Sequence, residues 1–174
     1  QRIEASLARL AHPEAYVQEV VEAAPASGFA YFDADTPMSP GTLPAVSFYK
    51  PAGRFTQHPS YTDLKSGDAH MAAVLEKLRA SPQWPDMLIV LTYDENGGYW
   101  DHVQPPSGPG WGDRFGPGTR IPALLIRPMV RKAHVDHTPY DTTSILKLLT
   151  RRFGLEPLAG VREKVGDLSG ALRP

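Results

Sequence analysis

A chain of 174 residues is long enough to bury the core of one domain, and its 41% hydrophobic and 21% charged residues are typical of ordinary globular proteins. Its 18 basic and 19 acidic residues give a net charge of −1, which excludes a chain-wide attraction to nucleic acid or to an anionic membrane. The absence of cysteine excludes disulfides and thiolate metal ligands, and no apolar run approaches the roughly 20 residues of a membrane span.

Two helices and one strand are predicted in the first half of the chain. Residues 1–24 are predicted to form a helix, because apolar residues recur on one helical face between positions 16 and 21. The aromatic residues between positions 29 and 32 either form a short strand or pack a loop onto the core, and packing is favoured. Residues 46–49 are predicted as a strand. Ser66 is the expected N-cap of a helix that ends near Ala80 and carries an apolar stripe of Met71, Val74, Leu75 and Leu78.

The second half contains two predicted strands, a long loop and a helix. The apolar run from residue 87 to 93 is typical of a strand buried on both faces, and residues 121–127 resemble a second one. Between them, residues 101–119 form a loop rich in glycine and proline. Asp141 or Thr142 is expected to cap a helix that ends before Gly154. The order β-α-β-loop-β-α predicts an α/β fold, and three strands make so thin a sheet that part of a larger one is expected elsewhere.

The sequence concentrates acidic residues at the end of the strand at 87–93. Asp94, Glu95 and Asn96 follow it directly, and ligands of open α/β sheets bind just beyond the carboxyl ends of the strands. Their oxygens suit a divalent cation of unknown identity, which is the predicted cofactor. The alternative is a plain acidic turn with no ligand.

Several loop residues are further candidates for binding or catalysis. His58, His102 and His137 lie in loops beside proline or acidic residues, where binding residues concentrate. Arg114 and Arg120 flank the glycine-rich loop and either hold phosphate oxygens or form salt bridges that organise the loop; for Arg120 the structural role is favoured. The neighbouring aromatic residues Tyr99, Trp100 and Trp111 either border a leaving group or pack the loop, and packing is favoured. A loop-pinning pair is also expected between Asp101 and His102, and between Asp136 and His137.

Four motifs in order resemble the bacterial phosphoesterase family, which joins non-specific phospholipases C to acid phosphatases. They are Thr92–Val103, Gly116–Pro122, Val135–Leu146, and the pair Leu43–Phe48 with His58-Pro59 upstream. The likeness covers residues 41–158 and matches residues 1–40 poorly. It implies an alkaline-phosphatase-like mixed sheet between helices, here a partial version within a single domain spanning residues 1–174. Thr142 stands where phospholipase C members tend to carry histidine, which leans toward the phosphatase side.

The resemblance also implies roles for individual residues. Asp94 and Glu95 match paired metal ligands, and His58 matches an active-site histidine beside the phosphate; Asn96, His102, Arg114, Arg120, His137 and Asp141 are candidates for substrate or supporting contacts. The family's Glu-Asn ligand pair and its Ser or Thr nucleophile have no match here. The chain is therefore expected to be the C-terminal part of a secreted or periplasmic enzyme, with its N-terminal half as partner and little activity in isolation.

The function predicted from the sequence is metal-dependent hydrolysis of a phosphate ester, with half of the active site in this chain. The expected substrate is a phospholipid head group or a small phosphomonoester, and nucleic acid is not an expected partner. The alternative is a non-catalytic domain of the same fold that binds an anion or another protein.

Overall fold

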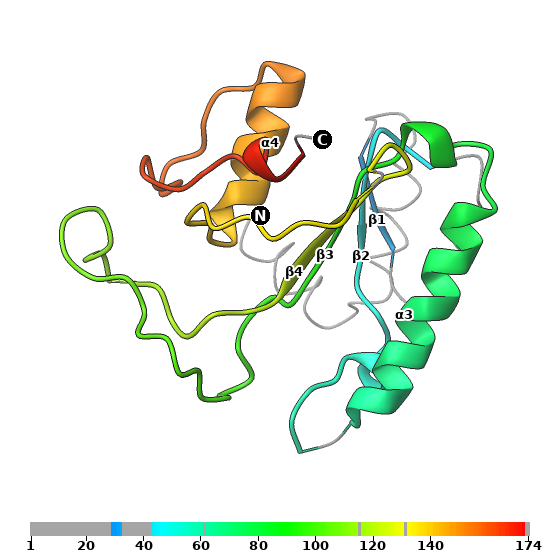
Figure 1. Ribbon diagram of the computed structural model, residues 1–174, viewed down its shortest axis with the longest axis horizontal. Coiled ribbons are helices and arrows are strands. Elements are labelled where there is room, and N and C mark those ends of the chain that lie inside the picture. The colour runs from blue at the N-terminus through cyan, green and yellow to red at the C-terminus, as the bar shows by residue number, and fades with distance from the viewer. Residues whose placement is uncertain (1–28, 33–42, 61, 115, 131, 173–174) are drawn as a thin grey trace, which may run out of the picture. The chain divides into compact units, whose positions relative to one another are not determined.

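The computed structural model describes residues 29–32, 43–60, 62–114, 116–130 and 132–172 (Figure 1). The chain divides into two compact units, Gln1–Trp84 and Pro85–Pro174, and each is described by itself. The helix predicted for residues 1–24 lies outside the described residues, and the single domain stays a prediction. Among the described helices, none has the length and apolar character needed to cross a membrane.

The first unit contains two short parallel strands, β1 (Phe29–Phe32) and β2 (Val46–Tyr49). Phe29 lies opposite Val46, and Phe32 lies opposite Tyr49. The predicted bounds of β2 are confirmed. At residues 29–32 the favoured interpretation, a packed loop, is wrong, because the backbone there pairs with β2 as a strand. A short aromatic run satisfies its backbone polar groups more fully in such a ladder than in a loop.

Helix α3 (Leu64–Arg79) follows the short helix η1 (Gly53–Phe55) and contacts it. Its N-cap is Asp63 and not Ser66 as predicted: the Asp63 carboxylate accepts hydrogen bonds from the backbone N–H and from the hydroxyl of Ser66, both at 2.8 Å. The prediction was wrong because a serine in the third helical position is also a good partner for an acidic cap. Val74 and Leu78 are buried, as the apolar stripe predicted.

His70 on α3 has a structural place in the first unit. Its ring stacks on Phe55 with centroids 4.3 Å apart, and its Nε2 lies 2.5 Å from the hydroxyl oxygen of Tyr49. Partial burial lowers the pKa of His70, with further lowering from Lys77 and Arg54. The histidine therefore joins α3 to β2 and η1 as a packed ring.

The second unit begins near the short helix η2 (Trp84–Asp86) and contains one antiparallel strand pair, β3 (Ile89–Thr92) and β4 (Ala123–Ile126). Ile89 lies opposite Ile126, and Thr92 lies opposite Ala123. Both strands form where predicted, but β3 is half-buried along its whole length, so the expectation of a strand buried on both faces is wrong. Residues 89–92 pair with only one neighbour among the described strands, which leaves one edge and part of each face accessible.

Helix α4 (Thr143–Phe153) ends at Gly154, whose φ of 63° is the left-handed conformation that glycine adopts without strain. Residues 158–172, here called the C-terminal segment, fold back against α4 and end in η3 (Gly170–Leu172) (Figure 1). The Nζ of Lys147 donates to the backbone oxygens of Glu163 and Val165, both at 2.8 Å. Val165 and Leu168 are buried there.

The described elements are compatible with the predicted α/β class. They form two separate two-stranded sheets, one parallel and one antiparallel, together with α3 and α4. The alkaline-phosphatase-like arrangement of a larger mixed sheet stays a prediction.

Candidate functional site

The candidate site begins with residues 94–99, here called the acidic turn, which are separated from the end of β3 only by Tyr93. Gly97 and Gly98 have φ values of 63° and 76°, so the chain reverses through two left-handed residues that glycine tolerates best. The carboxylate of Glu95 accepts from the backbone N–H of Gly97 at 2.6 Å, and the side-chain oxygen of Asn96 accepts from that of Gly98 at 2.9 Å. Asp94 and Glu95 are both exposed at this turn.

A threonine on the far side of the loop holds the acidic turn. The side-chain nitrogen of Asn96 donates to the Thr119 hydroxyl at 2.5 Å, and that hydroxyl donates to the backbone oxygen of Tyr99 at 3.2 Å. Asn96 therefore uses both ends of its amide within the protein. Its predicted contact with substrate stays a prediction, and the structure shows a bracing role.

Asp101 and Arg120 close the base of the glycine-rich loop, residues 101–119. Nε and Nη2 of Arg120 lie 2.6 and 3.0 Å from the two carboxylate oxygens of Asp101, and the Arg120 backbone N–H lies 3.3 Å away. The Arg120 hydrogen bond holds the pKa of Asp101 far below its usual value. The structural role favoured for Arg120 is confirmed, because the guanidinium fork is bound to Asp101. Asp101 also approaches His102, with 3.4 Å between its oxygen and Nδ1.

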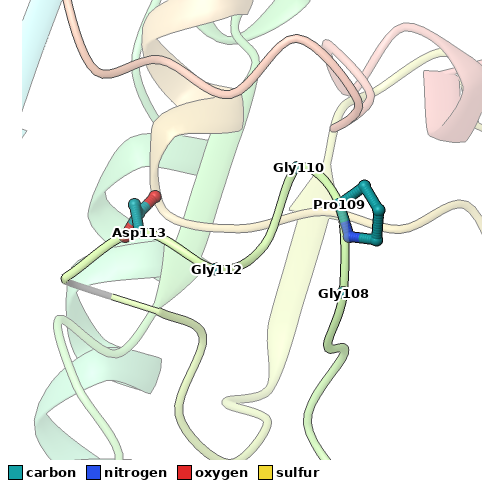
Figure 2. A pocket seen from close by; sticks show the side chains of 5 residues that line it. All are labelled: Gly108, Pro109, Gly110, Gly112 and Asp113. Atoms are coloured by element: carbon teal, nitrogen blue, oxygen red, sulfur yellow. The ribbon is translucent and has the colours of Figure 1, made fainter.

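The tip of the glycine-rich loop lies around an open hollow of about 490 Å³ lined by Gly108, Pro109, Gly110, Gly112 and Asp113 (Figure 2). Two cations of the C-terminal segment fasten this tip. The Nζ of Lys164 donates to the backbone oxygen of Pro109 at 2.6 Å. Arg162 donates through Nε and Nη2 to the Asp113 carboxylate at 3.0 and 3.1 Å.

Arg162 also reaches Asp141, which stands at the beginning of α4. Its Nη1 lies 2.5 Å from one carboxylate oxygen, while the other accepts from the backbone N–H and hydroxyl of Thr143 at 2.8 and 2.6 Å. Burial raises the pKa of Asp141, but the Thr143 and Arg162 hydrogen bonds outweigh it, and the pKa is lowered overall. The side chain of Thr142 makes no capping bond. Of the two predicted caps, Thr142 occupies the N-cap position, and Asp141 supplies the side-chain hydrogen bonds to the first turn of α4.

Asp136 is a third carboxylate saturated by its own neighbours. It accepts from the backbone N–H and the hydroxyl of Thr138, at 2.9 and 2.8 Å, and from the Tyr140 hydroxyl at 2.7 Å. The backbone bond from Thr138, followed by the Tyr140 hydroxyl, lowers the pKa of Asp136 to about 2. Its described partners are thus Thr138 and Tyr140, where His137 was expected.

The remaining candidates are exposed side chains. His102, Arg114 and His137 lie on loops of the second unit with accessible side chains, and their contacts with substrate stay predictions. The prediction that Trp100 packs the loop is wrong, because its relative exposure is 84%. Trp111 is half-buried, and the Arg162 guanidinium lies 5.8 Å from its ring centroid. His58 belongs to the first unit, is exposed, and has its Nδ1 2.6 Å from the backbone oxygen of Pro59. Its proximity to the acidic turn stays a prediction.

The acidic turn offers the type of ligand that a divalent cation prefers, but too few ligands to complete its coordination. Asp94 and Glu95 offer adjacent carboxylate oxygens, the ligands that hard cations prefer, but such cations take six to eight ligands. In the described part of the chain, no group of three or more His, Asp or Glu side chains is arranged to hold a metal ion. The turn can therefore contribute to a metal centre that other ligands complete.

Sequence reasoning missed Thr119, Asp113, Arg162 and Lys164. Thr119 lies inside the motif Gly116–Pro122, but its position 23 residues from Asn96 does not indicate that the two side chains are in contact. Arg162 and Lys164 follow α4 in a polar stretch whose charges resemble a solvated surface, and Arg162 reaches 49 residues back to Asp113. Contacts over such separations leave no local pattern in a single sequence.

Comparison with known proteins places these residues in a family. The Phosphoesterase family model matches residues 5–156. Phospholipase C B of Mycobacterium tuberculosis is 34% identical over 134 residues, which cover 65% of this chain and 26% of that protein. Non-specific phospholipase C1 of Arabidopsis thaliana is 39% identical over 98 residues, covering 49% of this chain and 18% of the relative.

A third relative extends the match along this chain. Non-hemolytic phospholipase C of Pseudomonas aeruginosa is 29% identical over 161 residues, which cover 75% of this chain and 23% of that protein. The chain thus spans about a quarter of the length of the curated relatives it matches. Because the family model covers most of the chain, including the acidic turn and the glycine-rich loop, the chain belongs to the Phosphoesterase family.

Proposed function

We propose that this chain supplies part of the active site of a metal-dependent phosphate-ester hydrolase of the phospholipase C type. The observation that carries the proposal is the acidic turn, where adjacent carboxylates stand at the end of β3 on a backbone braced by Thr119. Family membership and the names of the relatives support phosphate-ester hydrolysis. The remaining metal ligands and the Ser or Thr nucleophile belong, in this proposal, to an N-terminal half of the enzyme.

Four residues of the chain have a defined task in the proposed reaction. Asp94 and Glu95 hold the cation, which when bound supplies Lewis-acid polarisation of a phosphoryl oxygen. His58 binds a second phosphoryl oxygen or protonates the leaving group. Arg114, on the exposed glycine-rich loop, attracts the anionic ester and orients its phosphate through a planar fork.

The proposed substrate is a phosphodiester of a phospholipid head group. The three relatives are named as phospholipases C, which supports a diester over the small phosphomonoester of an acid phosphatase. Thr142, in place of the histidine expected of phospholipase C members, is the feature that favours the phosphatase alternative. An extracellular or periplasmic location suits hydrolysis of a lipid ester and is part of the proposal.

The test uses the full-length enzyme with Asp94→Asn and Glu95→Gln. Each change keeps the side-chain size and removes one negative charge, so we expect turnover of phosphatidylcholine vesicles to fall by roughly two or more orders of magnitude. Chelation of divalent metal should abolish turnover, and titration with Mn²⁺ or Zn²⁺ should restore it in the wild type. Parallel assays with p-nitrophenyl phosphate separate the diesterase from the phosphatase.

The matched control is Glu76→Gln, which makes the same chemical change on α3, where Glu76 pairs at the surface with Arg79. We expect this variant to keep wild-type turnover, because exposed helical ion pairs contribute little. Wild-type turnover in both acidic-turn variants would instead favour the non-catalytic anion- or partner-binding domain.

A further inference from the structure

The Thr119 hydroxyl connects two parts of the acidic turn at once. It accepts from the Asn96 amide at 2.5 Å and donates to the backbone oxygen of Tyr99 at 3.2 Å. A hydroxyl has one proton to donate, and here it goes to Tyr99. Since Asn96 precedes Gly97-Gly98 and Tyr99 follows them, a single side chain fixes the turn on both sides of its two left-handed glycines.

Three further hydrogen bonds of the acidic turn are local. Glu95 bonds to the N–H of Gly97, Asn96 to that of Gly98, and the N–H of Tyr99 to the backbone oxygen of Asn96 at 3.1 Å. Bonds across two or three residues fix the shape of a turn without fixing the direction in which the turn points. Thr119 is 20 residues beyond Tyr99 in the sequence. Its bonds therefore anchor the turn to a distant segment of the chain, which the local bonds do not.

The position of Thr119 is itself fixed by the next residue. Arg120 binds Asp101 with three donors, at 2.6, 3.0 and 3.3 Å, and β4 begins three residues later at Ala123. The Asp101 side chain is 12% exposed, so the acceptor of these three bonds is largely sheltered from water. Thr119 therefore acts from a rigid support immediately before a strand that pairs with β3.

We infer that Thr119 is a positioning residue for the Asp94–Glu95 pair, acting through Asn96 and Tyr99 to orient both carboxylates toward a divalent cation. The inference rests on the proposed function, since it assumes that the pair binds metal. Residues that hydrogen-bond behind metal ligands fix the ligands' orientation, and their loss typically weakens metal binding or activity 10- to 100-fold. In this inference Thr119 would act behind the carboxylates and would not itself be a metal ligand.

The experiment compares Thr119→Val, which removes the hydroxyl, with Thr119→Ser, which keeps it. Metal-free full-length enzyme is titrated with Mn²⁺ by isothermal calorimetry, and turnover is measured at saturating and limiting Mn²⁺. We expect the valine variant to bind Mn²⁺ roughly tenfold or more weakly and the serine variant to match the wild type. Thr150→Val, the same exchange on α4 of the same unit, should leave both quantities unchanged.

Three outcomes overturn the inference. In the first, Thr119→Val has wild-type Mn²⁺ affinity and turnover while Asp94→Asn loses both. This result would exclude the positioning role of Thr119 and would still support the proposed function. The second is unchanged metal binding and turnover in Asp94→Asn, which removes the proposed function itself. The third is failure of Thr119→Val and of Thr119→Ala to fold while Thr119→Ser folds, which assigns the hydroxyl to folding.

Discussion

The glycine-rich loop is fastened at its base and at its tip by different means. At the base, Asp101 binds Arg120 and Thr119 binds the acidic turn, and all of these residues lie within the family match at residues 5–156. At the tip, the fastening residues Arg162 and Lys164 lie beyond that match. The base is therefore built from the family's own region, and the tip depends on the C-terminal segment of this chain.

The two fastenings also differ in what they hold. The base bonds run directly into the turn that carries Asp94 and Glu95, whereas the tip bonds hold Asp113 and the beginning of α4 through Asp141. Damage to the base should therefore appear first in metal affinity and turnover. Damage to the tip should appear first in stability and in the accessibility of the loop.

Among changes to the two fastenings, the largest effect is expected from Arg120→Met at the base, tested in the full-length enzyme. Methionine keeps much of the apolar stem and removes both side-chain hydrogen bonds to Asp101, leaving only the backbone N–H bond, so the loop end that carries Thr119 is held less firmly. We expect Mn²⁺ affinity and turnover on phosphatidylcholine to fall roughly 10-fold or more.

Arg127→Met is the control for that change, because it makes the same exchange on an arginine just after β4, where Arg127 donates to the sulfur of Met129. Its turnover should match the wild type. Equal turnover in Arg120→Met and Arg127→Met would show that the base does not support the acidic turn.

Arg162→Met removes the hydrogen bonds that Arg162 donates to Asp113 at the tip of the loop and to Asp141. Arg162 is 13% exposed and binds two carboxylates, of which Asp141 is 12% exposed and sits at the beginning of α4. Leaving a buried charged acceptor without its donor costs about 1–3 kcal/mol, so the free energy of unfolding of the protein should fall by that amount. Urea unfolding of the wild type and variant measures the difference.

The same variant tests whether base and tip are separate. We expect Arg162→Met to retain wild-type Mn²⁺ affinity while limited proteolysis cuts the tip of the loop more rapidly, since Asp113 loses both hydrogen bonds from Arg162 and only Lys164 still holds the tip at Pro109. A loss of metal affinity equal to that of Arg120→Met would mean that the loop responds as one body.

Within each unit, the sequence predicted the helices and strands better than it predicted the contacts that those elements make. β2, β3 and β4 form within the predicted runs, and Gly154 ends α4 as expected, because strand and cap signals are local. The first residue of α3 was misplaced because Asp63 and Ser66 are both good capping residues and only their mutual bond shows which one caps. Strand burial was overestimated, since an apolar run does not reveal how many neighbours a strand has.

The position of the candidate carboxylates was predictable from the sequence, whereas most of the contacts that support them were not; their role as metal ligands stays a prediction. Asp94 and Glu95 follow β3 as the pattern indicated, and the structural role of Arg120 was anticipated from its place before a strand. The expected pair of Asp101 with His102 is present at 3.4 Å, but the closer contact of Asp101 with Arg120 was not predicted, because the two residues are 19 positions apart. Thr119 and Arg162 act over separations of 20 residues or more, which only folding brings together.

The smallest effect concerns Asp167, which keeps the C-terminal segment beside α4. Its carboxylate accepts from the Ser169 hydroxyl and from Arg151 at 2.6 Å, and these bonds lower its pKa to about 2 from the usual 3.8. Between these two values the unfolded chain binds more protons than the folded one. The stabilisation is therefore complete above about pH 4 and is lost as the pH falls through about 2.

Asp167→Asn removes this contribution at neutral pH, so its melting temperature at pH 7 should lie slightly below that of the wild type. The gap should narrow as the pH is lowered from 5 to 2, because the wild-type carboxylate also becomes neutral there. Thermal melts followed by circular dichroism at half-unit pH steps measure the gap. Glu156→Gln, an exposed carboxylate just after α4, is the control and should parallel the wild type at every pH. A gap for Asp167→Asn that stays constant down to pH 2 would show that the Arg151 and Ser169 bonds do not stabilise the ionised form, and that the segment bearing Arg162 and Lys164 is held by its buried Val165 and Leu168 instead.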